Sequence, residues 1–242
     1  MARGAPLATG MAQQLTLDLL PPPPPSLDNF VAGRNGPALD ALRHCAPGRA
    51  VYVWGPHGVG RSHLLQAACH HAGGLYYPAA GSASALHALA TGDTLPGPLV
   101  AVDDIHELSA DGQAALFALY NRWREVASTR QAFALVTAGD RAPLALELRE
   151  DLRTRLGWDL VFRLEQLTDE ERARALQSRA ADRGLDLAPE VISWLLTHHD
   201  RDMSRLSALV DALDRYSLAR HRAITLPLLK DLLANNRNSE HT

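Results

Sequence analysis

Cysteine is scarce in this sequence, and so is any excess of charge of one sign. The chain of 242 residues contains two cysteines, Cys45 and Cys69, which cannot build a disulfide framework and which suit a reducing cytosol. Its 24 Lys and Arg residues face 27 Asp and Glu residues, which leaves a net charge of -3. Because nucleic-acid binding depends largely on neutralised phosphates, this balance argues against a domain that is basic throughout. A small local basic patch is still compatible with this net charge.

Long apolar runs are also missing. A long stretch without a charged residue, 73–92, is interrupted by Gly, Pro, Ser and His and is too polar to span a bilayer. The N-terminus lacks the apolar core of a signal peptide. With 46% hydrophobic and 21% charged residues, the chain has enough apolar material for a sizeable core. We therefore expect a cytoplasmic protein with no membrane segment, built as one large or two small domains.

The first 26 residues do not have the pattern of a packed core. Five consecutive prolines at 21–25 favour a stiff polyproline II spacer of roughly 15 Å, at about 3.1 Å per residue. We expect residues 1–26 to form a flexible tail that holds a functional segment away from the body. Either Met1 or Met11 fits as the start of the chain, and the sequence does not decide between them.

From residue 27 to 164, strand-like and helical patterns alternate. The run at 99–102 is continuously apolar and closed by aspartates, as in a strand buried on both faces. Such alternation indicates an α/β domain with a parallel sheet and helices on both faces. The expected strands are 51–55, 75–78, 99–102 and 132–137, and the expected helices are 37–44, 60–71 and 111–126.

After residue 164 no further strand is expected. Thr168 and Glu171 have the spacing of a capping box that opens a helix ending near Gly184. Pro189 fits the first turn of the next helix, and two more apolar stripes follow. We expect a small all-α domain over 165–235 and a disordered C-terminus over 236–242.

A glycine-rich segment between an expected strand and an expected helix resembles a phosphate-binding loop. Its glycines let backbone N–H groups surround a phosphate, and the helix N-terminus adds a positive end. Arg61 stands where such loops usually have lysine, which leads us to expect nucleotide binding with weak hydrolysis. A glycine-rich turn without a ligand is the alternative. The residues expected to bind the cofactor are Gly55, Pro56, His57, Gly58, Val59, Gly60, Arg61, Ser62 and His63.

The apolar run at 99–102 and the two acidic residues after it look like the second nucleotide-binding motif of P-loop proteins. Asp103 would hold Mg²⁺ through water together with the Ser62 hydroxyl, and Asp104 would polarise an attacking water. An acidic turn after a strand is common and is the alternative. The motif follows the loop by one strand-helix unit, however, so coincidence is a poor explanation and nucleotide binding is the stronger hypothesis.

With these motifs on an α/β domain followed by a helical one, the chain resembles the AAA+ ATPases over roughly 27–233. Within them it resembles the family of the replication initiator DnaA and its shorter relative Hda, and the segment 26–33 is similar to the opening of the DnaA nucleotide domain. This resemblance implies a sensor role for Asp140 and an arginine finger at Arg155, with Arg153 as a rival. It implies a second sensor at Arg201, with Arg205 as a fallback.

The tail carries a further similarity. Residues Gln14, Leu15, Thr16, Leu17, Asp18 and Leu19 resemble the peptide by which partners dock on the replicative sliding clamp, although Asp18 departs from the usual proline. A glutamine followed by alternating leucines suits extended binding in an apolar groove. A plain disordered tail or an edge strand is the alternative. The chain ends at Thr242 just after the helical domain, so we expect no sequence-specific DNA-reading domain.

The resemblance implies ADP, or ATP, with Mg²⁺ as cofactors, since the Hda form tends to carry arginine in the loop and is associated with ADP. It implies DnaA and the DNA polymerase III sliding clamp (its beta subunit) as partners. We expect a regulator that stimulates ATP hydrolysis by DnaA and so restrains initiation of chromosomal replication. An autonomous AAA+ ATPase acting as a loader, or a tethering factor, is the alternative. A homo-oligomer is compatible with the sequence, which leaves the oligomeric state open.

Overall fold

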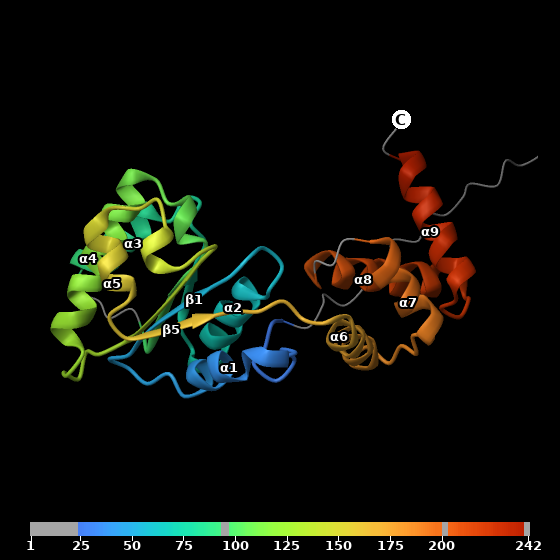
Figure 1. The fold of residues 1–242 in the computed structure, drawn as a ribbon, viewed down its shortest axis with the longest axis horizontal. Helices are drawn as coiled ribbons and strands as arrows, with labels where there is room; N and C mark the ends of the chain where they lie inside the picture. Colours follow the sequence, from blue (N-terminus) through green and yellow to red (C-terminus); the bar gives the residue numbers. More distant parts are fainter. Residues whose placement is uncertain (1–23, 93–96, 200–202, 240–242) are drawn as a thin grey trace, which may run out of the picture.

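The computed structural model describes residues 24–92, 97–199 and 203–239, which form an α/β domain followed by a helical domain (Figure 1). The α/β domain is built on a five-stranded parallel sheet with the strand order β2-β3-β4-β1-β5. Its strands are β1 Ala50–Trp54, β2 Leu75–Tyr77, β3 Leu99–Val102, β4 Ala134–Gly139 and β5 Leu160–Arg163. The predicted fold class, a parallel α/β sheet domain followed by a small helical domain, is confirmed.

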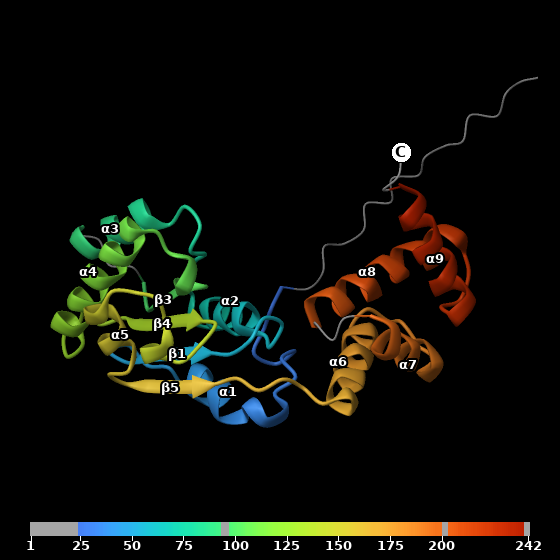
Figure 2. The same cartoon turned by 45° about the horizontal axis from the view of Figure 1, so that its top comes forward.

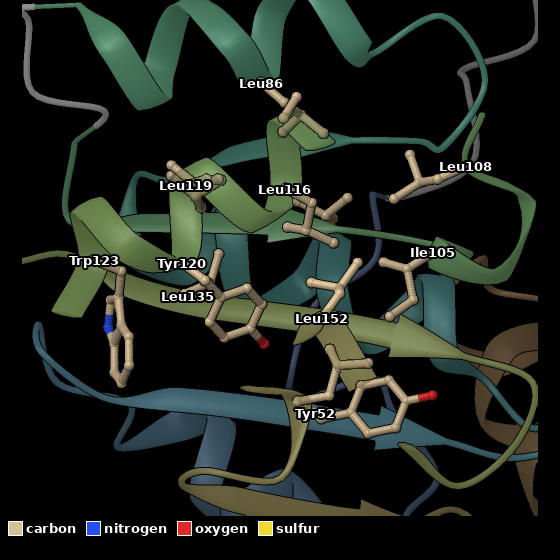
Figure 3. Close-up of a cluster of buried hydrophobic side chains, with 14 of the residues drawn as sticks. Tyr52, Leu86, Ile105, Leu108, Leu116, Leu119, Tyr120, Trp123, Leu135 and Leu152 are labelled. Atoms are coloured by element: carbon tan, nitrogen blue, oxygen red, sulfur yellow. The ribbon is translucent and has the colours of Figure 1, made fainter. Parts of the chain in front are cut away.

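Helices cover both faces of the sheet because its strands present apolar side chains on alternating sides. Along β1, Tyr52 joins one buried cluster, whereas Val51 and Val53 join the other. The first cluster packs under α3 Ala83–Thr91, α4 Ala110–Val126 and α5 Glu150–Leu156 (Figure 3). The second packs under α1 Gly36–Arg43 and α2 Arg61–Ala72.

The helical domain packs four helices around a separate apolar core: α6 Asp169–Ala181, α7 Pro189–His198, α8 Met203–Arg220 and α9 Leu226–Ser239 (Figure 2). The expected capping box is present. The Thr168 hydroxyl accepts from the Glu171 N–H at 3.2 Å, and the Glu171 carboxylate accepts from the Thr168 N–H at 2.7 Å. In the described part of the chain, no helix is long and apolar enough to cross a membrane.

Several elements differ from the sequence prediction. Helix α3 lies in an uncharged, alanine-rich stretch with one fully buried anchor, Leu86, and so shows little helical periodicity. Strand β5 lies at the edge of the sheet and alternates between half-buried and exposed residues, and its apolar run is only three residues long, 160–162. Helix α9 continues to Ser239, past the expected end of the helical domain at 235, and the expected disorder over 236–242 stays a prediction. Propagating a helix that is already anchored in a core costs little.

Candidate nucleotide-binding site

The glycine-rich segment forms a loop between the end of β1 at Trp54 and the start of α2 at Arg61. Two of its glycines have left-handed backbone conformations, with φ 80° at Gly58 and 95° at Gly60. A side chain at Gly60 would also meet the Phe30 ring, since a Cβ there would lie 2.7 Å from it. The loop therefore requires glycine at this position for two independent steric reasons.

A cavity of about 350 Å³ lies beside the loop, between the α/β domain and the helical domain. This volume is in the range of small-molecule sites. Of the residues expected to bind a cofactor, the following line it: Gly58, Val59, Gly60, Ser62 and His63. Gly55, Pro56, His57 and Arg61 are outside its lining.

One wall of the cavity comes from the helical domain, and its residues were not predicted from the sequence. Arg172, Ala175 and Arg179 follow one another at spacings of three or four residues and so share a face of α6, and Asp182, the C-cap residue of this helix, lies three residues further on. The Arg179 guanidinium donates to the carboxylate of Asp211 on α8, with its NH2 group 3.1 Å from Oδ2. Their helical spacing is the same as that of a solvated helix face, so the sequence offered no signal that distinguishes the two.

The opposite wall of the cavity comes from the segment that precedes α1. Pro25 and Phe30 line the cavity, and the Phe30 ring lies 5.5 Å from the ring of His63. A ring nitrogen of His63, Nε2, lies 3.1 Å from the carbonyl oxygen of Ser26. Burial lowers the pKa of His63, and the charge of Arg179 lowers it further. The imidazole and the phenyl ring give this end of the cavity an aromatic surface.

Arg61 lies beneath the loop and pairs with the second aspartate of the β3 motif. Its side chain is 8% exposed, and its NH2 group lies 2.9 Å from Asp104 Oδ1. Its NH1 group donates to the carbonyl oxygen of Gly55 at 2.9 Å. Burial raises the pKa of Asp104, and so does the charge of Asp103, while Arg61 pulls in the opposite direction. The structure thus brings together two residues that we had predicted to act separately.

Asp103 is almost fully buried at the end of β3, and its carboxylate accepts two internal hydrogen bonds. Oδ2 accepts from the hydroxyl of Tyr76 at 2.8 Å, and Oδ1 accepts from the N–H of Asp104 at 2.8 Å. Tyr76 was not predicted as a site residue. Ser62 lines the cavity and Asp103 does not, so the shared Mg²⁺ role of these two residues stays a prediction. Within the described ranges, no group of three His, Cys, Asp or Glu residues could hold a metal ion.

Asp140, the expected sensor, follows the last residue of β4. Its Oδ2 accepts two hydrogen bonds from Arg141, at 3.0 and 2.9 Å, and its Oδ1 is buried without a hydrogen-bond partner. Burial opposes ionisation of Asp140, but the Arg141 hydrogen bonds and the charge of His106 outweigh it and lower its pKa. Asp140 does not line the cavity, so its sensor role stays a prediction.

Arg155 is half-buried on α5 and is held in a defined orientation. Its NH2 group donates to Asn121 Oδ1 at 2.7 Å, and its guanidinium carbon lies 3.7 Å from the centre of the Phe117 ring and 5.0 Å from that of Trp158. Burial lowers its pKa, and so do the charges of Arg124 and Arg149. None of these side chains lines the cavity, and α4 and α5 lie at the end of the α/β domain away from the helical domain (Figures 1 and 2).

The remaining predicted residues lie elsewhere in the structure or outside its described part. Arg153, the rival finger, donates through NH1 to the carbonyl oxygen of Leu144 at 3.3 Å. Arg201, the expected second sensor, and the clamp-like segment 14–19 lie outside the described residues. Arg205, the fallback sensor, is described and is exposed on α8.

Comparison with known proteins supports the architecture. Residues 169–233 match the family model described as "Hda, lid domain". Domain III of the replication initiation protein DnaA from Thermotoga maritima superposes with a TM-score of 0.71 at 22% identity, covering 89% of this chain and 98% of that one.

Two further solved structures have the same fold. Replication initiator DnaA bound to AMPPCP and single-stranded DNA matches with a TM-score of 0.66 at 22% identity, over 88% of this chain and 68% of that one. The RuvB Holliday junction branch migration motor of Thermotoga maritima matches with a TM-score of 0.63 at 18% identity, over 87% and 72%. The chain thus has the fold of DnaA domain III, and residues 169–233 match the Hda lid family model, in agreement with the predicted resemblance.

Proposed function

We propose that this protein is an ADP-binding AAA+ regulator that stimulates ATP hydrolysis by DnaA while docked on the DNA-loaded sliding clamp. The nucleotide would occupy the cavity between the loop and the lid, with its phosphates on the backbone N–H groups of the loop and the start of α2. Mg²⁺, where it accompanies the nucleotide, would be held by Ser62 and, through water, by Asp103, and it would neutralise phosphate charge. The Hda lid domain over residues 169–233 supports this assignment.

The observation that carries the proposal is the placement of Arg155. It is oriented by Asn121 and Phe117 on a face remote from the chain's own cavity, which suits delivery to a nucleotide held by another molecule. A guanidinium supplied in trans neutralises charge that develops on the transferred phosphoryl group and contributes ~10³–10⁵ in rate. The hydrolysed bond would belong to DnaA, and the effect would be to restrain replication initiation in the cytoplasm.

The test is an assay of ATP hydrolysis by DnaA with clamp loaded on DNA. We expect Arg155→Ala to lose stimulation, whereas Arg153→Ala, a matched change on the same helix, retains it. Full stimulation by Arg155→Ala would reject the finger. Brisk ATP turnover by this protein alone would instead favour an autonomous ATPase or loader.

The clamp-docking part has its own test. Deleting residues 14–19 should abolish stimulation while leaving ADP binding intact, because the residues that line the cavity all come later in the chain. The same assay without clamp gives the baseline. Equal stimulation by the deleted and full-length proteins would reject docking through this segment.

A further inference from the structure

Arg61 and Asp104 form an ion pair. This pairing gives them roles that differ from those of the equivalent residues in a standard phosphate-binding site. Arg61 is buried beneath the loop, with both terminal nitrogens bonded inside the protein, and it lies outside the lining of the cavity. We propose that Asp104 is a specificity-determining residue: by holding Arg61 away from the phosphates, it makes the site favour a nucleoside diphosphate over a triphosphate. This inference rests on the proposed nucleotide binding.

The pair resists opening. Arg61 is 8% exposed and Asp104 is 33% exposed, so withdrawing the guanidinium would leave a largely buried carboxylate without its partner. Removing one member of a buried ion pair is strongly unfavourable, because the remaining charge keeps its desolvation penalty. A lysine at this position would make only single-point contacts, whereas the planar fork of arginine reaches Gly55 and Asp104 together.

A diphosphate does not need Arg61. The loop that lines the cavity offers backbone N–H groups, the positive end of α2 and the hydroxyl of Ser62, and these suffice to hold a β-phosphate. A third phosphate adds negative charge near the aspartates at the end of β3, as in other P-loop sites. Because Arg61 balances Asp104, no free cation from this pair compensates for the added charge.

The backbone conformation at Asp104 allows the pair to be tested by substitution with Asn or Gly. Its φ of 45° is left-handed, a conformation that Asn and Gly adopt more readily than other residues. Asp104→Asn removes the charge but keeps an oxygen that can accept from Arg61. Asp104→Gly removes the whole side chain, so it should release Arg61 more completely.

The experiment compares the affinities for ADP and for AMPPCP, a triphosphate analogue, by calorimetry on the full-length chain at one fixed Mg²⁺ concentration. We expect the wild type to prefer ADP. Asp104→Gly should shift the ratio toward AMPPCP by about tenfold, the size of one hydrogen bond to a charged group, and Asp104→Asn by less. Folding of each variant is checked by urea unfolding, and Asp104→Asn carries the test if Asp104→Gly does not fold.

Two controls separate the causes. Arg61→Met combined with Asp104→Asn has no cation to release, so its ratio should stay close to that of the wild type. Asp159→Asn breaks another Arg–Asp pair, with Arg49, at a distance from the cavity and should also leave the ratio unchanged.

Each outcome bears on a definite claim. Absence of ADP binding by the wild type would overturn the nucleotide-binding proposal and this inference together. Binding without a preference for ADP, or with an unchanged ratio in the Asp104 variants, would overturn only the inference. A shift that persists in the double variant would also overturn it, because removal of negative charge would then explain the effect without Arg61.

Discussion

Arg155 depends on two neighbours on α4 for its orientation, so the proposed finger can be weakened without changing residue 155 itself. Asn121 supplies an acceptor 2.7 Å from NH2, and the Phe117 ring lies 3.7 Å from the guanidinium carbon. Asn121→Ala removes the acceptor. Phe117→Leu keeps an apolar side chain of similar size but removes the aromatic face. Both changes leave the loop and the cavity untouched.

The expected magnitudes follow from these contacts. A hydrogen bond to a charged group contributes about 1.5–3 kcal/mol when buried, and the half-buried position of Arg155 reduces this to about 1 kcal/mol, or roughly fivefold in rate. A partly exposed cation–π contact contributes about 0.5–1 kcal/mol, or roughly two- to fivefold. Loss of the guanidinium itself should cost ~10³ or more. The two neighbours share one partner, so their combined effect need not be additive.

The assay is DnaA ATP hydrolysis at saturating loaded clamp, with ADP binding measured in parallel for each variant. We expect stimulation to fall in the order wild type, then Phe117→Leu and Asn121→Ala, then Arg155→Ala, with ADP affinity unchanged. A loss in Asn121→Ala as complete as in Arg155→Ala would show that Asn121 does more than orient the arginine. Unchanged stimulation in both neighbour variants would refute the positioning argument.

Three further predictions concern stability and binding. Hydrogen bonds from Arg49, and then from the Ala50 N–H, lower the pKa of Asp159, so its contribution to stability is present above about pH 4 and is lost as the pH falls through its folded pKa. The free energy of unfolding should therefore differ between the wild type and Asp159→Asn at pH 7, and this difference should shrink at pH 3; a constant difference would contradict the linkage. Thr168→Ala removes a cap from α6 and should cost about 1 kcal/mol in urea unfolding. Phe30→Ala removes an aromatic wall of the cavity and should weaken ADP binding by about tenfold in calorimetry, with no change in binding arguing against this cavity as the nucleotide site.

Local sequence rules succeeded where a single short segment carries the whole signal. The run at 99–102 is the observed β3, because burial on both faces requires every residue to be apolar. The capping box at Thr168 and Glu171 follows from chemistry within one helical turn. The position of the glycine-rich loop between β1 and α2 likewise followed from residue type and spacing, while the roles of its residues and of Asp103 and Asp104 stay predictions.

Sequence rules failed where the signal is spread over distant segments. Edge strand β5 is defined by its pairing with β1, which lies about a hundred residues earlier in the chain. The lining of the cavity combines residues from α6 and α8 of the helical domain with Phe30 and His63 of the α/β domain. None of these side chains has a local pattern that distinguishes a cavity wall from a solvated helix face.

By itself the sequence determined the α/β architecture, the glycine-rich loop, the capped helix α6 and the arginine candidates, because each depends on periodicity or on neighbours within a few residues. Only the tertiary structure decided what the charged groups do. It paired Arg61 with Asp104, residues more than forty positions apart, and it oriented Arg155 against Asn121 and Phe117 from another helix. The physical reason is that the chemical role of a charged side chain depends on its partner and on its burial. Packing between distant parts of the chain sets both.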